Sequence, residues 1–114
     1  MSTHGGLETF PNPRPERDFE IAIDCPEFTS MCPVTGQPDF SSVEIVYEPA
    51  ERCIESKSLK LYLWSFRDQQ LFAEGMAAAI AAEVHRAAAP ASVRVTVTQH
   101  VRGGIVTEAT AQLP

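Results

Sequence analysis

Basic residues are scarce in this chain, and it has no long apolar run. The 114 residues include nine Lys and Arg against 15 Asp and Glu, which gives a net charge of -6. An acidic balance argues against a protein built mainly to coat nucleic acid, because the phosphate backbone attracts a basic surface. No apolar segment is long enough to span a bilayer, and the first residues lack the basic and apolar regions of a secretory signal. We therefore expect a cytoplasmic protein that contacts neither a membrane nor nucleic acid directly.

Cysteine is also rare, and its spacing is irregular. The three residues are Cys25, Cys32 and Cys53. An odd number favours a reducing compartment over a disulfide framework. The sequence contains no C-x-x-C pair and no H-x-x-x-H pair, which argues against a zinc site. We expect no metal centre, and we interpret Cys25 and Cys53 as structural thiols.

The length indicates one domain with a small core. Residues 1–17 are rich in proline, glycine and charge and predict an extended N-terminal arm, for which a neighbouring subunit is one possible surface. Residues 18–114 would form the domain. Because a core of this size is small, self-association would add stability.

Alternating apolar and polar residues predict four strands, at 19–24, 43–48, 93–98 and 105–110. The pair Gly103-Gly104 is typical of a tight hairpin turn between the last two strands. Almost twenty residues separate the first two strands, and connections of that length in small domains are usually functional.

Two helices are expected between the strand pairs. An apolar stripe at i, i+3, i+4 and i+7 predicts the first helix, with Leu59, Tyr62, Leu63 and Phe66 on one face. An alanine-rich second helix would be capped by Asp68 and end before Pro90. Its expected inward residues are Phe72, Met76, Ala79, Ile80 and Val84. The order β-β-α-α-β-β predicts an α+β domain with an antiparallel sheet and helices on one face.

Cys32 and Asp39 are seven positions apart in a segment with two prolines and a glycine. We interpret Cys32–Phe40 as a stiff loop outside any helix or strand. Such a loop can hold a thiol nucleophile and a proton-carrying carboxylate at one reacting atom. The competing interpretations are a small buried cysteine and an ordinary turn aspartate.

Polar residues gather where the first helix should begin. Lys57 and Lys60 lie one turn apart, and Glu55 and Ser56 stand at the helix start, where backbone N–H groups favour an anion. Arg102 would add a planar guanidinium for phosphate. The alternative is a solvated helix face.

Glu74, near the start of the second helix, has two interpretations. It could be a first-turn acid that interacts with the helix dipole, or a carboxylate that accepts hydrogen bonds from a purine-like edge.

Four segments together resemble the QueF family, NADPH-dependent reductases of 7-cyano-7-deazaguanine on the pathway to the modified tRNA base queuosine. They are Asp24–Pro33 (DCPEFTSMCP), Thr35–Phe40 (TGQPDF), Glu55–Tyr62 (ESKSLKLY) and Arg102–Ile105 (RGGI). The third matches the family signature E-[SL]-K-[SA]-h-K-[LY]-[YFW] at every position. The resemblance covers nearly everything from Asp24 to Ile105, and the short chain is similar to the unimodular branch.

The resemblance implies a tunnelling fold (T-fold), homo-oligomeric rings that can stack in pairs, and active sites between subunits. It implies that Cys32 attacks the nitrile carbon to form a thioimide and that Asp39 moves the protons. Glu74 would anchor the deazaguanine ring in a pocket with Ile54, Glu55, Ser56 and Ala73. NADPH would be held by Lys57, Lys60, Arg102 and Gly103.

One position departs from the family pattern, which usually has His immediately before the substrate-binding Glu. Here the pair reads Ala73-Glu74. The departure favours one alternative, a non-catalytic T-fold protein that keeps the purine pocket. A second alternative is an amidinotransferase that shares the Cys and Asp but transfers ammonia; the intact Lys57 and Lys60 argue against it. A zinc cyclohydrolase on the same fold lacks its ligand spacing.

Overall fold

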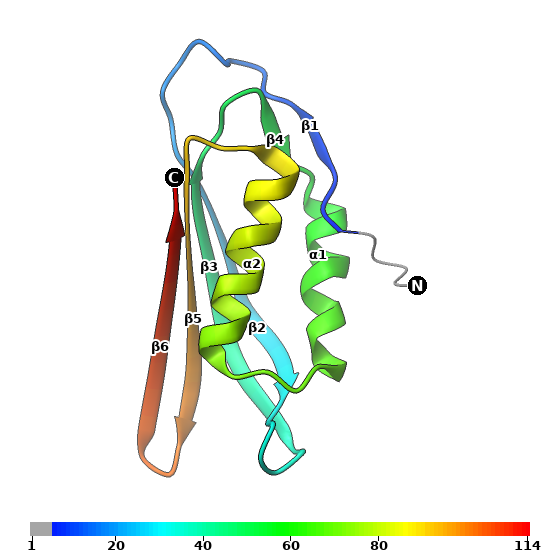
Figure 1. The fold of residues 1–114 in the computed structure, drawn as a ribbon, viewed down its shortest axis with the longest axis vertical. Coiled ribbons are helices and arrows are strands. Elements are labelled where there is room, and N and C mark those ends of the chain that lie inside the picture. The colour runs from blue at the N-terminus through cyan, green and yellow to red at the C-terminus, as the bar shows by residue number, and fades with distance from the viewer. Residues whose placement is uncertain (1–5) are drawn as a thin grey trace.

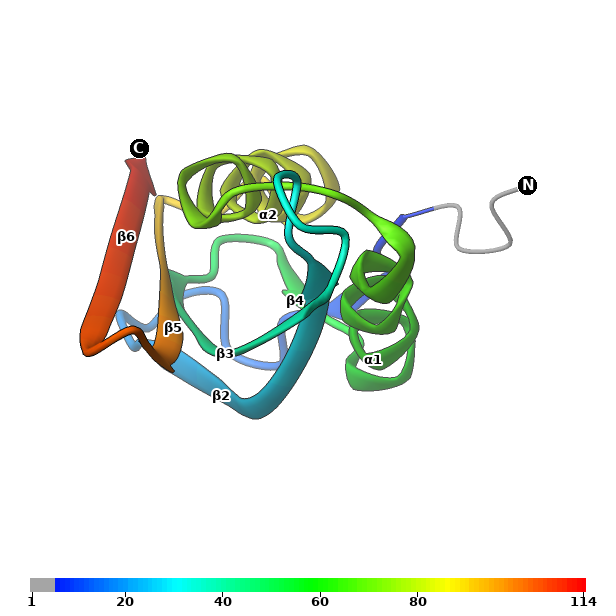
Figure 2. The same cartoon turned by 90° about the horizontal axis from the view of Figure 1, so that it is seen from below.

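The computed structural model describes residues 6–114 and shows a four-stranded sheet with two helices on it and a small two-stranded sheet (Figure 1). The elements are β1 Thr9–Pro11, β2 Ile21–Met31, β3 Pro38–Glu48, β4 Arg52–Ile54, α1 Ser56–Trp64, the 3-10 turn η1 Ser65–Asp68, α2 Ala73–Ala88, β5 Ser92–Arg102 and β6 Ile105–Leu113. The long strands form an antiparallel sheet of order β2-β3-β5-β6. The α2 helix packs on β5 and β6, whereas η1 and α1 lie against β2, and both helices cover the same face (Figure 2). The predicted α+β class is confirmed.

The first hairpin is longer than predicted. β2 continues to Met31 and β3 already begins at Pro38, so the predicted loop of almost twenty residues was wrong, as was the exclusion of Pro38–Phe40 from a strand. A register shift between Cys25 and Phe28 absorbs the irregular segment. Pro26 lies in this bulge on an edge strand, where a missing N–H is tolerated. The connection that carries Cys32 is therefore a short turn.

The core lies between the sheet and α2. Val95 and Val97 of β5 and Ile45 of β3 are at most 1% exposed, and Met76, Ile80 and Val84 of α2 are fully buried against this face. Burying these side chains supplies the main driving force for the fold. The predicted stripe is confirmed by the burial of Leu59 and Leu63 in α1 and of Phe66 in η1, whereas Tyr62 is partly buried.

The second helix differs from the prediction in its start and in part of its inner face. It begins at Ala73 after Phe72, so Asp68 does not cap it but ends η1. Phe72 is 57% exposed and Ala79 is also exposed, contrary to expectation. The inner positions are instead filled by small residues, among them Ala73, Ala77, Ala81 and Ala88. Because alanine is compatible with either face of a helix, the sequence pattern did not show which alanines of α2 face the core.

Residues 7–12 of the predicted arm pack on their own domain. β1 pairs with β4, Leu7 is 6% exposed, and the Asn12 amide donates to the carbonyl of Glu51 at 2.9 Å. Met1–Gly5 lie outside the described residues, and the boundary at residue 17 stays a prediction. No helix within residues 6–114 has the length and hydropathy needed to cross a membrane.

Candidate active site

Cys32 opens the turn between β2 and β3. Its amide donates to the carbonyl of Gln37 at 2.8 Å, and the Gly36 amide donates back to the carbonyl of Cys32 at 2.9 Å. Gly36 adopts φ +71°, a left-handed conformation that favours glycine. The Thr35 hydroxyl accepts from the Gln37 amide at 3.2 Å. These bonds hold the turn, and with it the position of the Cys32 side chain.

The turn also changes the chemistry of the thiol. Hydrogen bonds from the Thr35 side chain, then from the backbone of Thr35 and Val34, lower the pKa of Cys32, although the nearby Asp39 charge opposes the shift. The other two cysteines differ: Cys53 is buried, and burial raises the pKa of Cys25. A thiolate is the nucleophilic form of cysteine, so Cys32 is the thiol best suited to reaction.

Asp39 is a buried carboxylate and not an exposed turn residue. It is 6% exposed and lies directly across the ladder from Ser30, two residues before Cys32. Arg102 Nη1 donates to Asp39 Oδ1 at 2.6 Å. The predicted proton carrier therefore has a charged partner, and that partner is a residue predicted to hold NADPH.

Buried polar residues cluster at this end of the sheet. Apart from Asn12, the buried polar side chains of the described residues are Ser30, Asp39, Ser41 and Gln99. The ladder pairs Ser30 with Asp39 and Ser41 with Gln99. The hydroxyls of Ser30 and Ser41 have no hydrogen-bond partner among the described residues. A buried hydroxyl without a partner is costly, which marks this end of the sheet as chemically unusual.

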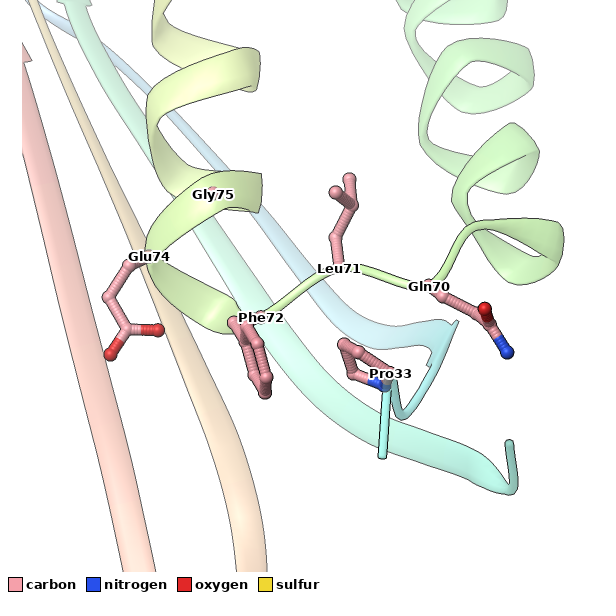
Figure 3. A pocket seen from close by; sticks show the side chains of 6 residues that line it. All are labelled: Pro33, Gln70, Leu71, Phe72, Glu74 and Gly75. Carbon is pink, nitrogen blue, oxygen red and sulfur yellow. The ribbon is translucent and has the colours of Figure 1, made fainter. Parts of the chain in front are cut away.

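A hollow of about 470 Å³ lies between the Cys32 turn and the start of α2 (Figure 3). It is lined by Pro33, Gln70, Leu71, Phe72, Glu74 and Gly75. The Met31 amide donates to the carbonyl of Gln69 at 2.9 Å, and this bond ties the linker before α2 to the turn. Pro33 and Glu74 therefore line the same hollow, whereas Cys32, which precedes Pro33, is not among its lining residues.

Phe72 is a residue of this hollow that the sequence reasoning missed. It was expected in the core, but its exposed ring projects from the linker immediately before α2 (Figure 3). Its position two residues before Glu74 was the feature of the sequence that could have indicated a place in this hollow. Ala73 is 2% exposed and packs in the core rather than on the wall of the hollow.

Comparisons with known proteins identify the family of this chain. A family model for QueF-like proteins matches residues 38–114. The chain is 56% identical over 106 residues to the NADPH-dependent 7-cyano-7-deazaguanine reductase of Anaeromyxobacter sp. (strain Fw109-5), covering 93% of this chain and 87% of that protein. The protein of the same name from Alkalilimnicola ehrlichii is 55% identical, with 93% and 82% covered. The chain belongs to the QueF-like family.

The fold of this QueF-like chain is shared with a solved relative. The crystal structure of the archaeosine synthase QueF-Like in the apo form superposes with a TM-score of 0.77 at 24% identity, covering 82% of this chain and 91% of that chain. This likeness confirms the T-fold that the sequence predicted.

Four other predicted residues of the QueF-like chain, Ile54, Glu55, Ser56 and Lys57, lie where β4 leads into α1. The Glu55 carboxylate caps the helix, because it accepts from the amides of Lys57 at 2.8 Å and Ser58 at 2.7 Å. These two bonds, Ser58 first, lower the pKa of Glu55. The expectation that a ligand anion would take these N–H groups was wrong, since Glu55 itself is the anion they bind. Ile54 is buried and donates its amide to the Tyr47 hydroxyl at 2.9 Å.

One chain brings some predicted residues together and separates others. The turns that carry Cys32 and Gly103, and the start of α2 with Glu74, lie at one end of the sheet, and β4 lies toward the opposite end (Figure 1). Ile54 is bonded to Tyr47 near that other end of β3. Ser56 lies between these ends, because it lines a groove that also includes Phe40 and Ser41.

A larger groove of about 780 Å³ runs between α1 and the edge strand β2 of the QueF-like chain. Its walls include Ser56, Lys60, Trp64 and Arg67, with the Arg67 guanidinium 3.5 Å from the centre of the Trp64 ring. Neither Lys57 nor Lys60 pairs with a carboxylate within residues 6–114. Over the same range, no cluster of three or more His, Cys, Asp or Glu side chains is arranged to hold a metal ion.

Proposed function

We propose that this protein reduces the nitrile of 7-cyano-7-deazaguanine to the primary amine of 7-aminomethyl-7-deazaguanine with NADPH, in the biosynthesis of queuosine for tRNA modification. The observation that carries the proposal is the Cys32 turn, whose donors favour the thiolate, beside the buried carboxylate of Asp39. The named relatives at 56% and 55% identity support the same substrate and cofactor.

Cys32 and Asp39 perform the covalent step. Asp39 accepts the thiol proton, and the sulfur lone pair forms a bond to the nitrile carbon. One π pair of the C≡N bond moves to nitrogen, which takes the proton back from Asp39, and a neutral thioimide results. This addition converts a poor hydride acceptor into an activated C=N bond and divides one difficult step into easier ones. A positioned acid prevents a bare nitrogen anion from accumulating.

Glu74 and Phe72 hold the substrate at the hollow. The Glu74 carboxylate accepts hydrogen bonds from the N–H groups of the deazaguanine edge, as acidic side chains do with amino groups of bases. The Phe72 ring supplies an apolar surface for a flat heterocycle. Ala73 contributes by packing the first turn of α2 on the core, which sets where its neighbour Glu74 begins.

The pocket is completed by a second copy of the chain. The hollow that Glu74 lines does not include Ile54, Glu55 or Ser56 of the same chain. They line the same pocket only if a neighbouring subunit supplies them. We therefore propose a homo-oligomer, a ring or two stacked rings, with sites between subunits.

The residues that would hold NADPH fit an anionic dinucleotide. Lys57 and Lys60 present exposed ammonium groups, and Gly103 has nothing near the place of a side chain, so a phosphate can approach the backbone. Arg102 retains 47% exposure of its side chain. When bound, the cofactor supplies the hydrides that take the nitrile to the amine, since no side chain can supply hydride.

The decisive experiment follows NADPH oxidation in the near ultraviolet with and without the nitrile, together with the mass of the chain. We expect nitrile-dependent oxidation and, without NADPH, a covalent adduct of the substrate's mass. Cys32→Ala should abolish both, whereas the control Cys25→Ala should keep both. An adduct without oxidation would favour the amidinotransferase or the binding protein, and an adduct on Cys32→Ala would remove Cys32 as the nucleophile.

A further inference from the structure

Arg102 is held by two side chains at once. Its Nη1 donates to Asp39 Oδ1 at 2.6 Å and its Nη2 donates to Gln99 Oε1 at 2.8 Å. The Asp39 side chain is 8% exposed and Gln99 is 4% exposed, so both acceptors are fixed within the sheet. Two bonds on one guanidinium define its plane as well as its position.

The strand geometry explains why these three residues meet. Gln99 pairs with Ser41, two residues beyond Asp39 on β3. The ladder between β5 and β6 is irregular between Gln99 and Arg102, and such irregularities redirect side chains near functional sites. Arg102 is thereby directed back across the sheet toward Asp39, although the two residues lie 63 positions apart.

The contact has a chemical consequence at the level of single atoms. Arg102 bonds to Oδ1 of Asp39, whereas Oδ2 has no hydrogen-bond partner among the described residues. The carboxylate cannot rotate without breaking a short charge-assisted bond. Its other oxygen is thus held in one direction, and a fixed direction favours proton transfer from Cys32.

We infer that Arg102 and Gln99 are positioning residues for the thiol-addition step, acting through Asp39, in addition to any contact of Arg102 with cofactor phosphate. The inference rests on the proposed function, because it assigns these residues to the same nitrile addition. Gln99 holds Arg102, Arg102 holds Oδ1 of Asp39, and Oδ2 exchanges the proton. A purely cofactor-binding Arg102 has no part in a step that occurs before NADPH is used.

The experiment measures the rate of adduct formation from the nitrile in the absence of NADPH. We expect Arg102→Ala to slow it about tenfold or more, the rate equivalent of one hydrogen bond to a charged group. Gln99→Leu should slow it by a smaller factor, and Arg102→Lys should restore part of the rate. The matched control is Arg86→Gln, which removes a surface ion pair of the same 2.6 Å length to Glu83 and should leave the rate unchanged.

A second readout separates positioning from general damage. Varying the nitrile concentration should show that the maximal rate of addition falls while the affinity for the nitrile is retained. Adduct formation at the wild-type rate in Arg102→Ala, with only the KM for NADPH raised, would overturn the inference. If Arg102→Ala does not fold, Arg102→Lys and Gln99→Leu decide, and wild-type rates in both would also overturn it. Absence of any adduct on the wild-type protein would instead reject the proposed function, and the inference with it.

Discussion

Cysteine chemistry in this protein depends on where each thiol sits. Cys32 opens a turn whose hydroxyl and amides stabilise the thiolate, and its pKa is lowered. Cys25 lies in a bulge on β2, where its sulfur donates to the carbonyl of Glu27 at 3.3 Å and burial raises its pKa. The same side chain is therefore activated in one place and suppressed in another.

This difference predicts selective alkylation. Iodoacetamide should modify Cys32 first, with a midpoint at lower pH than for an ordinary thiol. Thr35→Val should move that midpoint to higher pH, because the Thr35 hydroxyl contributes most to the lowered pKa of Cys32. Peptide mass spectrometry over a pH series measures both effects. Earlier modification of Cys25 or Cys53 would contradict the prediction.

At the scale of elements, the sequence predicted part of each long strand. The end of β3 at Glu48 and the start of β6 at Ile105 were predicted correctly, whereas the second half of β2 and the first residues of β3 were missed. Val93, Val95 and Val97 alternate clearly and are buried as expected. The extension of β2 to Met31 was not predicted, because a proline such as Pro26 normally argues against a strand. A bulge between Cys25 and Phe28 accommodates it here. The turn after β5 was predictable, since Gly103 and Gly104 both adopt positive φ.

The same reasoning accounts for what could be predicted of the site. Cys32, Asp39 and Glu74 are recognisable because their residue types and motifs imply chemistry without coordinates. The contact between Arg102 and Asp39 was not predictable, because it depends on an irregular ladder that joins residues far apart in the chain. Phe72 was misassigned because an aromatic residue before an alanine-rich helix is normally a core residue.

Two glycines provide a matched test of backbone geometry. Gly36→Ala should destabilise the protein by about 1 kcal/mol, the cost of a left-handed conformation for a residue with a side chain, because its φ is +71°. Gly75→Ala, in the first turns of α2 with its nearest neighbour atom 4.0 Å away, should stabilise by up to about 1 kcal/mol. Urea unfolding measures the change in the free energy of unfolding for both variants. Equal changes of the same sign would contradict the different backbone conformations described for Gly36 and Gly75.

The cap of α1 predicts a pH dependence. Because folding lowers the pKa of Glu55, its charge stabilises the folded state above the pKa of the unfolded chain. That contribution disappears as the pH falls through the lowered, folded-state pKa. Glu55→Gln should therefore lower the melting temperature near neutral pH and differ little from the wild type in acid. A difference in melting temperature that grows as the pH falls would contradict this prediction.

At the scale of the whole molecule, the proposal that sites form between subunits can be tested by mixing two variants. Cys32→Ala lacks the nucleophile, and the double variant Lys57→Ala, Lys60→Ala lacks the proposed cofactor clamps. If sites form between subunits, co-refolded mixtures should oxidise NADPH in the presence of the nitrile although neither variant does so efficiently alone. The double variant by itself should still form the adduct. A mixture no more active than its components would indicate a site within one chain.

The sheet ends on β2 at one side and on β6 at the other. Within residues 6–114, the outer border of β2 is bridged only at Met31, by Gln70, and β6 pairs with β5 alone. Several large apolar side chains, Val101, Ile105 and Val106, are exposed close to the β6 border. Such borders invite further strands. If the proposed ring covers these borders, strong dilution should release subunits whose exposed strands adsorb to vessel walls, and storage of this protein would favour high concentration.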